Sequence, residues 1–173
     1  SADDFLVIMN LNEVKEQLIS MPIWKGEIIV EPLEGGITNH NYIITDSKDK
    51  YVARFGDDLI HHQVMRFNEL AASKAAFEVG IAPKVIHHEK GLLIFEYIQS
   101  SPLALERLRE ENTLKKIISL MKIIHKKIPH YYRGPAMIFW VFYVIKDYAW
   151  TLKKMNSSYI DKLNYLIEDS NKF

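Results

Sequence analysis

The chain has 173 residues, of which 48% are hydrophobic and 25% charged, an ordinary globular composition with enough residues for one good core or two small lobes. Its 22 basic and 22 acidic residues give a formal net charge of +0, which excludes a general nucleic-acid or anionic-membrane binder and requires any anion site to be local. The absence of cysteine excludes disulfides and thiolate metal sites and fits a reducing compartment, so we expect a cytoplasmic protein.

The first hundred residues predict a sheet with helices. Leu11, Val14 and Leu18 recur at helical spacing and predict a short amphipathic helix over residues 10–20. Stretches with strand character follow at residues 27–30, 41–45, 50–55, 85–88 and 92–97. A helix is predicted over residues 63–79, with Gly80 as its stop. Adjacent hairpins with one inserted helix favour an α+β fold, in which a five-stranded antiparallel sheet carries one packed helix.

The rest of the chain has helical character. Ser101 and Pro102 fit the N-cap and first position of one helix, and Asn112 fits the N-cap of the next. That next helix carries a periodic apolar stripe, formed by Leu114, Ile117, Ile118, Met121 and Ile124. Two further helices are predicted over residues 136–153 and 158–168. The apolar run 137–145 is far shorter than the ~20 residues that span a bilayer, so we interpret it as a buried helix and expect no membrane insertion.

This change of character sets the predicted domain boundaries. Residues 1–97 are expected to form a mixed lobe, residues 98–101 a hinge, and residues 102–173 an incomplete helical lobe. The prediction depends on the shift in composition, because no repeat or low-complexity linker marks a boundary.

A turn rich in glycine and short polar side chains joins the first two predicted strands, and its sequence is Gly35-Gly36-Ile37-Thr38-Asn39-His40-Asn41. Glycine lets the backbone pass close to a ligand, and exposed N–H groups of such a turn can form an anion-binding concavity. The turn therefore indicates a place for the phosphates of a nucleotide. An ordinary hairpin with a long polar turn is the alternative.

One cation and one carboxylate accompany this turn. Val52 and Arg54 point to the same face of the third strand, where Arg54 suits a phosphate and Val52 offers apolar surface to a base. Glu69 shares a helical stripe with Ala72 and Ala76, whose small side chains favour a close-packed face. We expect Glu69 to brace Arg54, as a glutamate braces the cation of a protein-kinase ATP site. The alternatives are a surface arginine and a glutamate on a solvated helix face.

The segment 92–98 leaves the sheet and enters the helical part of the chain. Its backbone N–H and C=O groups could meet the edge of an adenine, although a simple connector is the alternative. Turn, cation, glutamate and crossing segment occur in the order that a kinase-like N-terminal lobe requires.

Five motifs closely resemble the choline/ethanolamine kinase family, and they lie at residues 35–42, 51–54, 68–69, 80–85 and 95–98. The likeness is nearest to the LicA-type choline kinases, within the wider group that resembles aminoglycoside phosphotransferases. It spans roughly residues 27–128 and implies a protein-kinase-like N-terminal lobe. The activity that it implies is the ATP- and Mg²⁺-dependent phosphorylation of choline, or of ethanolamine.

The resemblance also implies roles for residues. It places Gly36, Thr38, Asn39 and His40 over the ATP phosphates. Arg54 takes the place of the ATP-contacting cation, Glu69 braces it, and Val52 lies beside the base. The backbones of Glu96 and Ile98 meet the adenine.

The family's catalytic signature, His-x-Asp followed by Asn and a second Asp, is not found in the sequence. We therefore expect an N-terminal portion that is inactive alone, with the catalytic Asp and the Mg²⁺ ligands beyond Phe173. A non-catalytic nucleotide-binding or pseudokinase module is the main alternative. Another is a kinase of the same fold that acts on an aminoglycoside, thiamine or an amino sugar.

Two weaker candidate sites are set aside. The histidine pairs at 61–62 and 87–88 lack the spacing of a zinc site, so no metal ligand is assigned. Aromatic side chains could form a cage for a quaternary ammonium by cation–π attraction. We interpret them instead as core residues, and they are Tyr131, Tyr132, Trp140, Tyr143, Tyr148 and Trp150.

Overall fold

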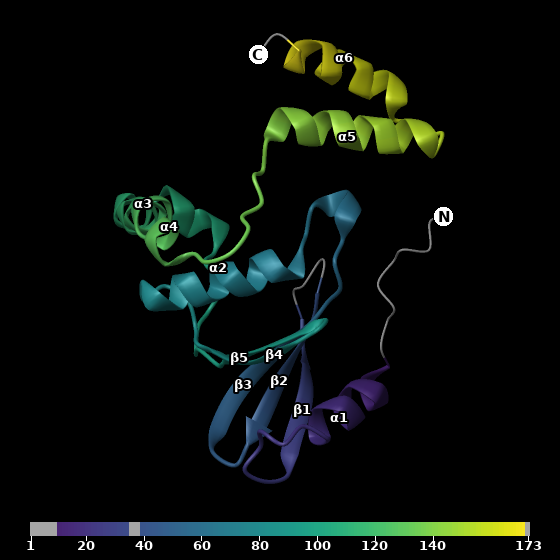
Figure 1. Ribbon diagram of the computed structural model, residues 1–173. Helices are drawn as coiled ribbons and strands as arrows, with labels where there is room; N and C mark the ends of the chain where they lie inside the picture. The colour runs from purple at the N-terminus through teal and green to yellow at the C-terminus, as the bar shows by residue number, and fades with distance from the viewer. Residues whose placement is uncertain (1–9, 35–38, 172–173) are drawn as a thin grey trace. The chain divides into compact units, whose positions relative to one another are not determined.

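The computed structural model describes residues 10–34 and 39–171, and the chain forms two compact units, residues 1–134 and 135–173. The first unit contains the sheet and helices α1–α4, and the second contains α5 and α6 (Figure 1). The lobe boundary expected at residues 98–101 is a different division and stays a prediction.

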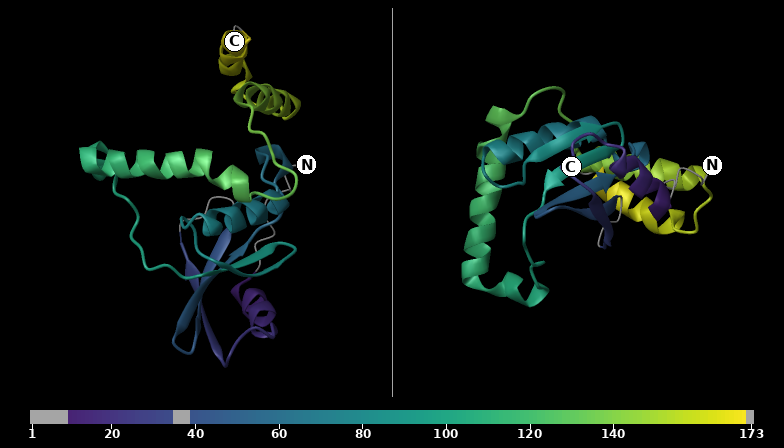
Figure 2. Two further views of the ribbon diagram at one scale, coloured as in Figure 1. Left: turned by 60° about the vertical axis from the view of Figure 1, so that its left-hand side comes forward. Right: turned by 90° about the horizontal axis from the view of Figure 1, so that it is seen from below.

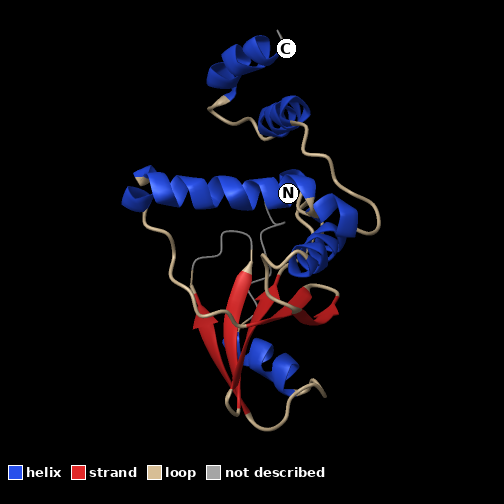
Figure 3. Cartoon of the chain, turned by 90° about the vertical axis from the view of Figure 1, so that its left-hand side faces the viewer, coloured by secondary structure: helices blue, strands red, loops and turns tan. Residues whose placement is uncertain are grey.

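The first unit is built on a five-stranded antiparallel sheet with strand order β1-β2-β3-β5-β4 (Figure 3). Its strands are β1 (Ile28–Leu33), β2 (His40–Asp46), β3 (Asp49–Phe55), β4 (Val85–Glu89) and β5 (Leu92–Glu96). A two-residue turn links β2 to β3, with Asp46 paired to Asp49. The predicted α+β fold class is confirmed.

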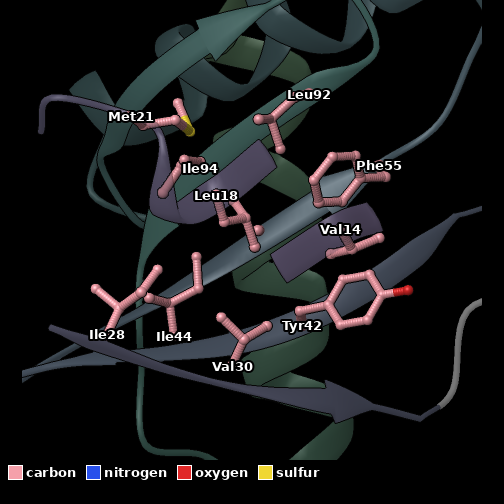
Figure 4. Close-up of a cluster of buried hydrophobic side chains, with 11 residues drawn as sticks. Val14, Leu18, Met21, Ile28, Val30, Tyr42, Ile44, Phe55, Leu92 and Ile94 are labelled. Carbon is pink, nitrogen blue, oxygen red and sulfur yellow. The ribbon is translucent and has the colours of Figure 1, made fainter. Parts of the chain in front are cut away.

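Helix α1 (Leu11–Ile19) packs its apolar face on the sheet. Asn10 caps the helix, because its side chain accepts from the Asn12 N–H at 2.7 Å while the Glu13 carboxylate accepts from the Asn10 N–H at 3.0 Å. The main hydrophobic cluster lies between α1 and the strands (Figure 4), and it includes Val14, Leu18, Ile28, Val30, Tyr42, Ile44, Phe55, Leu92 and Ile94. The core therefore occupies one face of the sheet.

The other face of the sheet carries the residues that alternate with this core. Ala53 and Phe55 of β3 are buried in the cluster, so Arg54 between them points away from α1. Helix α2 (Arg66–Glu78) lies on that second face. Gly80, with φ of 77°, ends it as predicted, because the N–H groups of Gly80 and Ile81 close back onto the carbonyls of Phe77 and Ala76.

The start of α2 corrects the predicted helix at residues 63–79. Gln63 has a left-handed φ of 55°, and Val64 pairs with Leu59 in an isolated β-bridge. A 3₁₀ turn, Ile60–His62, fills the loop between these two bridge residues. Because the Gln63 N–H closes the 3₁₀ turn onto the Ile60 carbonyl at 3.0 Å and Val64 lies in the bridge, α2 begins only at Arg66.

Two predicted helix starts after the sheet are wrong. Residues 101–104 are not helical, and a 3₁₀ turn (Leu105–Arg109) stands in their place. Leu103 and Leu105 are exposed, so a helix there would lack the packing that stabilises short helices. Asn112 lies inside α3 (Glu111–Lys126), because the Leu114 N–H already bonds to the Glu110 carbonyl at 3.0 Å.

Helix α3 is strongly amphipathic, but Leu114, Ile118, Met121 and Ile124 on it are all more than 40% exposed. The short helix α4 (Ile128–Tyr131) follows it and packs against α2, where the Tyr132 hydroxyl donates to Asn68 Oδ1 at 2.6 Å. Figure 2 shows the long connection from β5 that leads to the start of α3. The segment of α3 and α4 is thus joined to the rest of the unit through the contact of α4 with α2.

The second unit is a pair of helices, α5 (Val141–Lys154) and α6 (Ile160–Ser170). Residues 136–140 are not helical, so the predicted helix 136–153 starts too early. The interpretation of 137–145 as buried is also wrong: Val144 is buried, but Ile138, Phe139 and Trp140 are exposed. α5 has α6 on one side, which leaves its other apolar side chains uncovered within the unit. No described helix is long and apolar enough to cross a membrane.

Candidate functional site

An ion pair joins the sheet to α2. Arg54 of β3 and Glu69 in the first turn of α2 meet at 2.7 Å between Nη1 and Oε1, with side chains 36% and 18% exposed. The period of two in β3 turns Arg54 toward α2, and the first helical turn favours an acidic side chain. The structure thus brings together the cation and the carboxylate that the sequence paired.

The guanidinium of Arg54 has further neighbours on the same face of the sheet. The Phe95 ring centroid lies 5.1 Å from its Cζ, within the range of a cation–π contact. Its Nε donates to Asn41 Oδ1 at 3.4 Å, across the β2–β3 pair. Within the described residues, Nη2 has no hydrogen-bond partner, so Arg54 keeps donors for an anionic ligand.

A second arginine, Arg66, also pairs with Glu69, and no role at the site was predicted for it from the sequence. Its Nη1 donates to Glu69 Oε2 at 2.7 Å, so each carboxylate oxygen faces a different guanidinium. The i, i+3 spacing of Arg66 and Glu69 within a predicted helix was the sequence signal for this ion pair. That signal is weak, because Arg107 and Glu110 have the same spacing in an exposed pair at 3.7 Å.

Burial and hydrogen bonding act in opposite directions on Glu69. Burial raises the pKa of its carboxyl. The hydrogen bonds and charges of Arg54 and Arg66 lower the same pKa by more than burial raises it, so the net pKa lies below its ordinary value. The carboxylate is therefore ionised at neutral pH. The side-chain cluster of Arg54, Glu69 and Arg66 carries one positive charge in total, and the carboxylates of Asp57 and Asp58 lie beside it.

This lowered pKa predicts an acid-dependent loss of stability. The contribution of ionised Glu69 is present above the unfolded-state value near 4.3 and disappears as the pH falls through the lower folded-state pKa. We expect the free energy of unfolding of the unmodified chain to fall more steeply below pH ~4.5 than that of Glu69→Gln. Urea titrations at several pH values measure the difference.

The matched control for this titration is Glu111→Gln, which removes a carboxylate that pairs with Lys115 at 2.6 Å with both side chains exposed. Exposed pairs contribute little, so its pH profile should follow that of the unmodified chain. Parallel profiles for Glu69→Gln and the unmodified chain would contradict a stabilising role of the ionised carboxylate.

The end of the glycine-rich turn lies next to this cluster. Gly36 and Thr38 lie outside the described residues. Asn39 precedes β2, and His40 opens it opposite Phe55. Asn39 Oδ1 and His40 Nε2 are buried and, within the described part of the chain, have no hydrogen-bond partner. Two polar atoms therefore remain to be satisfied at the end of β3 that carries Arg54.

The remaining predicted residues lie further along the strands. Val52 is on the face of Arg54 and pairs with Phe95. Glu96 pairs with Tyr51, which lies roughly 10 Å along β3 from Arg54. The Glu96 N–H already donates to the Lys84 carbonyl at 3.0 Å, and Ile98 is exposed after β5 ends. Glu96 and Ile98 thus mark the other end of the candidate site.

A cavity of about 690 Å³ opens beside the ion-pair cluster. Its lining includes Arg54, Arg66 and Glu69, with Asp57 and Asp58 from the link between β3 and α2. Among the predicted residues that the structure describes, Arg54 and Glu69 are the two that line it. Over residues 10–34 and 39–171, no group of three or more His, Asp or Glu side chains could hold a metal ion.

Comparison with known families gives one clear result. Residues 30–172 match the sequence profile described as choline/ethanolamine kinase, which covers most of the chain. A comparison with curated proteins gives no match.

Comparison with solved structures agrees with the fold. A choline kinase from Cryptosporidium parvum Iowa II superimposes with a TM-score of 0.63 at 17% identity, covering 84% of this chain and 43% of that one. A Plasmodium vivax ethanolamine kinase gives a TM-score of 0.58 at 18% identity, with 84% and 39% covered. The chain therefore spans less than half the length of these structures, and the likeness shows a shared fold.

Proposed function

We propose that this chain, which belongs to the choline/ethanolamine kinase family, supplies the nucleotide-binding part of an ATP-dependent phosphotransferase. The acceptor would be the primary hydroxyl of a small alcohol, choline before ethanolamine. The observation that supports this most is the Arg54–Glu69 pair, which holds a cation of the third strand against α2 while leaving Nη2 of that cation available.

The residues present fit a nucleoside triphosphate. Arg54 would bind a phosphate oxygen through its free guanidinium edge, because a guanidinium is permanently charged and its donors match phosphate geometry. Asn39 and His40, with Gly36 and Thr38 of the turn, would lie over the phosphates. Val52 would contact the base, and the Glu96 carbonyl and the Ile98 N–H would meet the adenine edge. Residues 1–97 would then form the nucleotide lobe of a cytoplasmic enzyme.

Phosphoryl transfer breaks the bond between the γ-phosphorus and its bridging oxygen and forms one to the acceptor oxygen, while the hydroxyl proton leaves to a base. Mg²⁺ would neutralise the phosphates in such a reaction, but the described residues do not offer a carboxylate cluster for it. The part that this chain plays is to bind and orient the nucleotide. The groups that activate the acceptor are proposed to lie elsewhere in the complete polypeptide.

A phosphoryl-transfer assay on the complete polypeptide tests this function. ADP release from MgATP should depend on added choline or ethanolamine and should be slower with thiamine, an amino sugar or an aminoglycoside. MgATP binding without turnover on any acceptor would favour a non-catalytic module. Faster turnover of an aminoglycoside than of choline would identify aminoglycosides as the acceptor class. Absence of MgATP binding would overturn the proposal.

A further inference from the structure

We infer that Arg66 is a positioning residue, which holds Glu69 so that Arg54 presents a free guanidinium edge to the nucleotide phosphates. The inference rests on the proposed nucleotide site and deepens it, because it assigns the phosphate affinity of Arg54 to a three-membered cluster. The contacts that carry it are those of Arg66, of Glu69 and of Gly56.

Arg66 is anchored more firmly than Arg54. Its side chain is 16% exposed, and its Nε donates to the Asp57 carbonyl at 2.8 Å while Nη1 donates to Glu69. Its backbone N–H donates to Asp58 Oδ1 at 2.7 Å, which supplies a cap that the N-cap residue Met65 does not provide. The link between β3 and α2 therefore fixes where the Arg66 guanidinium lies.

The anchored guanidinium decides how Glu69 can meet Arg54. A carboxylate facing a single arginine tends to accept two parallel hydrogen bonds, which would use both terminal nitrogens of that arginine. Here Oε2 is taken by Arg66, so Arg54 donates to Oε1 through Nη1. Nη2 of Arg54 consequently remains available to a phosphate oxygen.

Gly56 permits this arrangement at the end of β3. A Cβ at this position would collide with Arg66 Nη2 and would lie 2.7 Å from Asn39 Oδ1, so both side chains would have to move. Gly56→Ala therefore displaces Arg66 while every charge is retained. Gly26→Ala is the matched control, because the nearest atom to its Cβ would be Ser47 Oγ at 3.9 Å.

A double-mutant cycle on the complete polypeptide tests the inference, with MgATP and phosphate-free adenosine as calorimetric probes. Arg66→Gln should weaken MgATP binding roughly tenfold and leave adenosine binding unchanged. In an Arg54→Ala background the same change should weaken MgATP binding by less than about twofold, because residues that act as a unit are not additive. Arg66→Lys should restore part of the affinity, since it keeps the charge without the planar fork.

Gly56→Ala should weaken MgATP binding in an Asn39→Ala background as well, where no Asn39 amide is left to displace, and Gly26→Ala should not. These variants keep the test valid if Arg66→Gln fails to fold. Arg107→Gln, which breaks an exposed pair of the same spacing, should leave both affinities unchanged.

Three outcomes would overturn the inference alone. The first is an unchanged MgATP affinity in Arg66→Gln, and the second is a loss of adenosine affinity in Arg66→Gln equal to its loss of MgATP affinity. The third is a tenfold loss of MgATP affinity when Arg66→Gln is added to Arg54→Ala, which would make Arg66 itself a phosphate ligand. Absence of MgATP binding in the unmodified polypeptide would overturn the proposed function and this inference with it.

Discussion

Replacing Arg54 with alanine is expected to weaken MgATP binding by roughly tenfold to a hundredfold, the cost of losing a charge-assisted hydrogen-bond donor of ~1.5–3 kcal/mol. The side chain is free to act on a ligand, because 36% of it is exposed and its Nη2 is unpaired within the described residues. Binding of adenosine should be unchanged, since adenosine carries no phosphate. Calorimetric titration of the complete polypeptide with both probes measures the difference.

This variant should fold, which makes the result interpretable. Removing Arg54 leaves Glu69 paired with Arg66 at 2.7 Å, so no buried carboxylate loses all its partners. Arg107→Ala serves as the control, because Arg107 is exposed and distant in sequence from the site. Equal MgATP affinity in Arg54→Ala and the unmodified protein would remove Arg54 from the nucleotide site.

Replacing Ile44 with alanine is expected to destabilise the first unit by ~2–5 kcal/mol, the usual cost of truncating a buried isoleucine. Ile44 is 0% exposed and belongs to the cluster between α1 and the sheet (Figure 4). Removing its side-chain carbons would leave a cavity, because the structure around a truncated core residue relaxes only partially. Chemical denaturation followed by circular dichroism measures the loss.

Ile29→Ala is the matched control, because Ile29 lies in the neighbouring strand β1 but is 62% exposed. It should change the free energy of unfolding by no more than about 0.5 kcal/mol. Similar losses in the two variants would contradict the placement of the core on the α1 face. Because Arg54 lies on the opposite face, folded Ile44→Ala should keep its MgATP affinity.

The strands could be anticipated because they follow from local rules, and the pairing of Arg54 with Glu69 could be anticipated from the logic of a protein-kinase ATP site. Alternation along β3 places Val52 and Arg54 on one face whatever packs there. Hairpin turns then fix the neighbours within β1–β3 and within β4–β5, and the expected antiparallel sheet of five strands is confirmed. The pairing of β3 with β5, which joins the two halves, is a long-range contact. The family resemblance is confirmed as well, by the profile match over residues 30–172.

Errors arose where a pattern that is compatible with a helix lacked tertiary support. Val64 continues the apolar spacing of α2, but its backbone lies in a β-bridge to Leu59, and Gln63 before it has a left-handed φ. Residues 137–145 are apolar enough for a core, yet burial requires a partner surface, and α6 covers one side of α5. Apolar composition indicates what a segment can bury and does not show what covers it.

The sequence by itself determined the family, through its motifs, and the strands along the chain, because periodicity and turn chemistry act over a few residues. The facing of Arg54 and Glu69 was expected from the kinase-like order of the motifs, and only the tertiary structure decided that β5 pairs with β3. Only the tertiary structure decided that Arg66 takes the second oxygen of Glu69 and that Gly56 leaves room for its guanidinium. The physical reason is that the hydrogen bonds of a carboxylate depend on the distance and direction of the donors around it. Those distances are set by how the link between β3 and α2 folds, and the i, i+3 spacing of Arg66 and Glu69 is by itself too weak a signal to predict them.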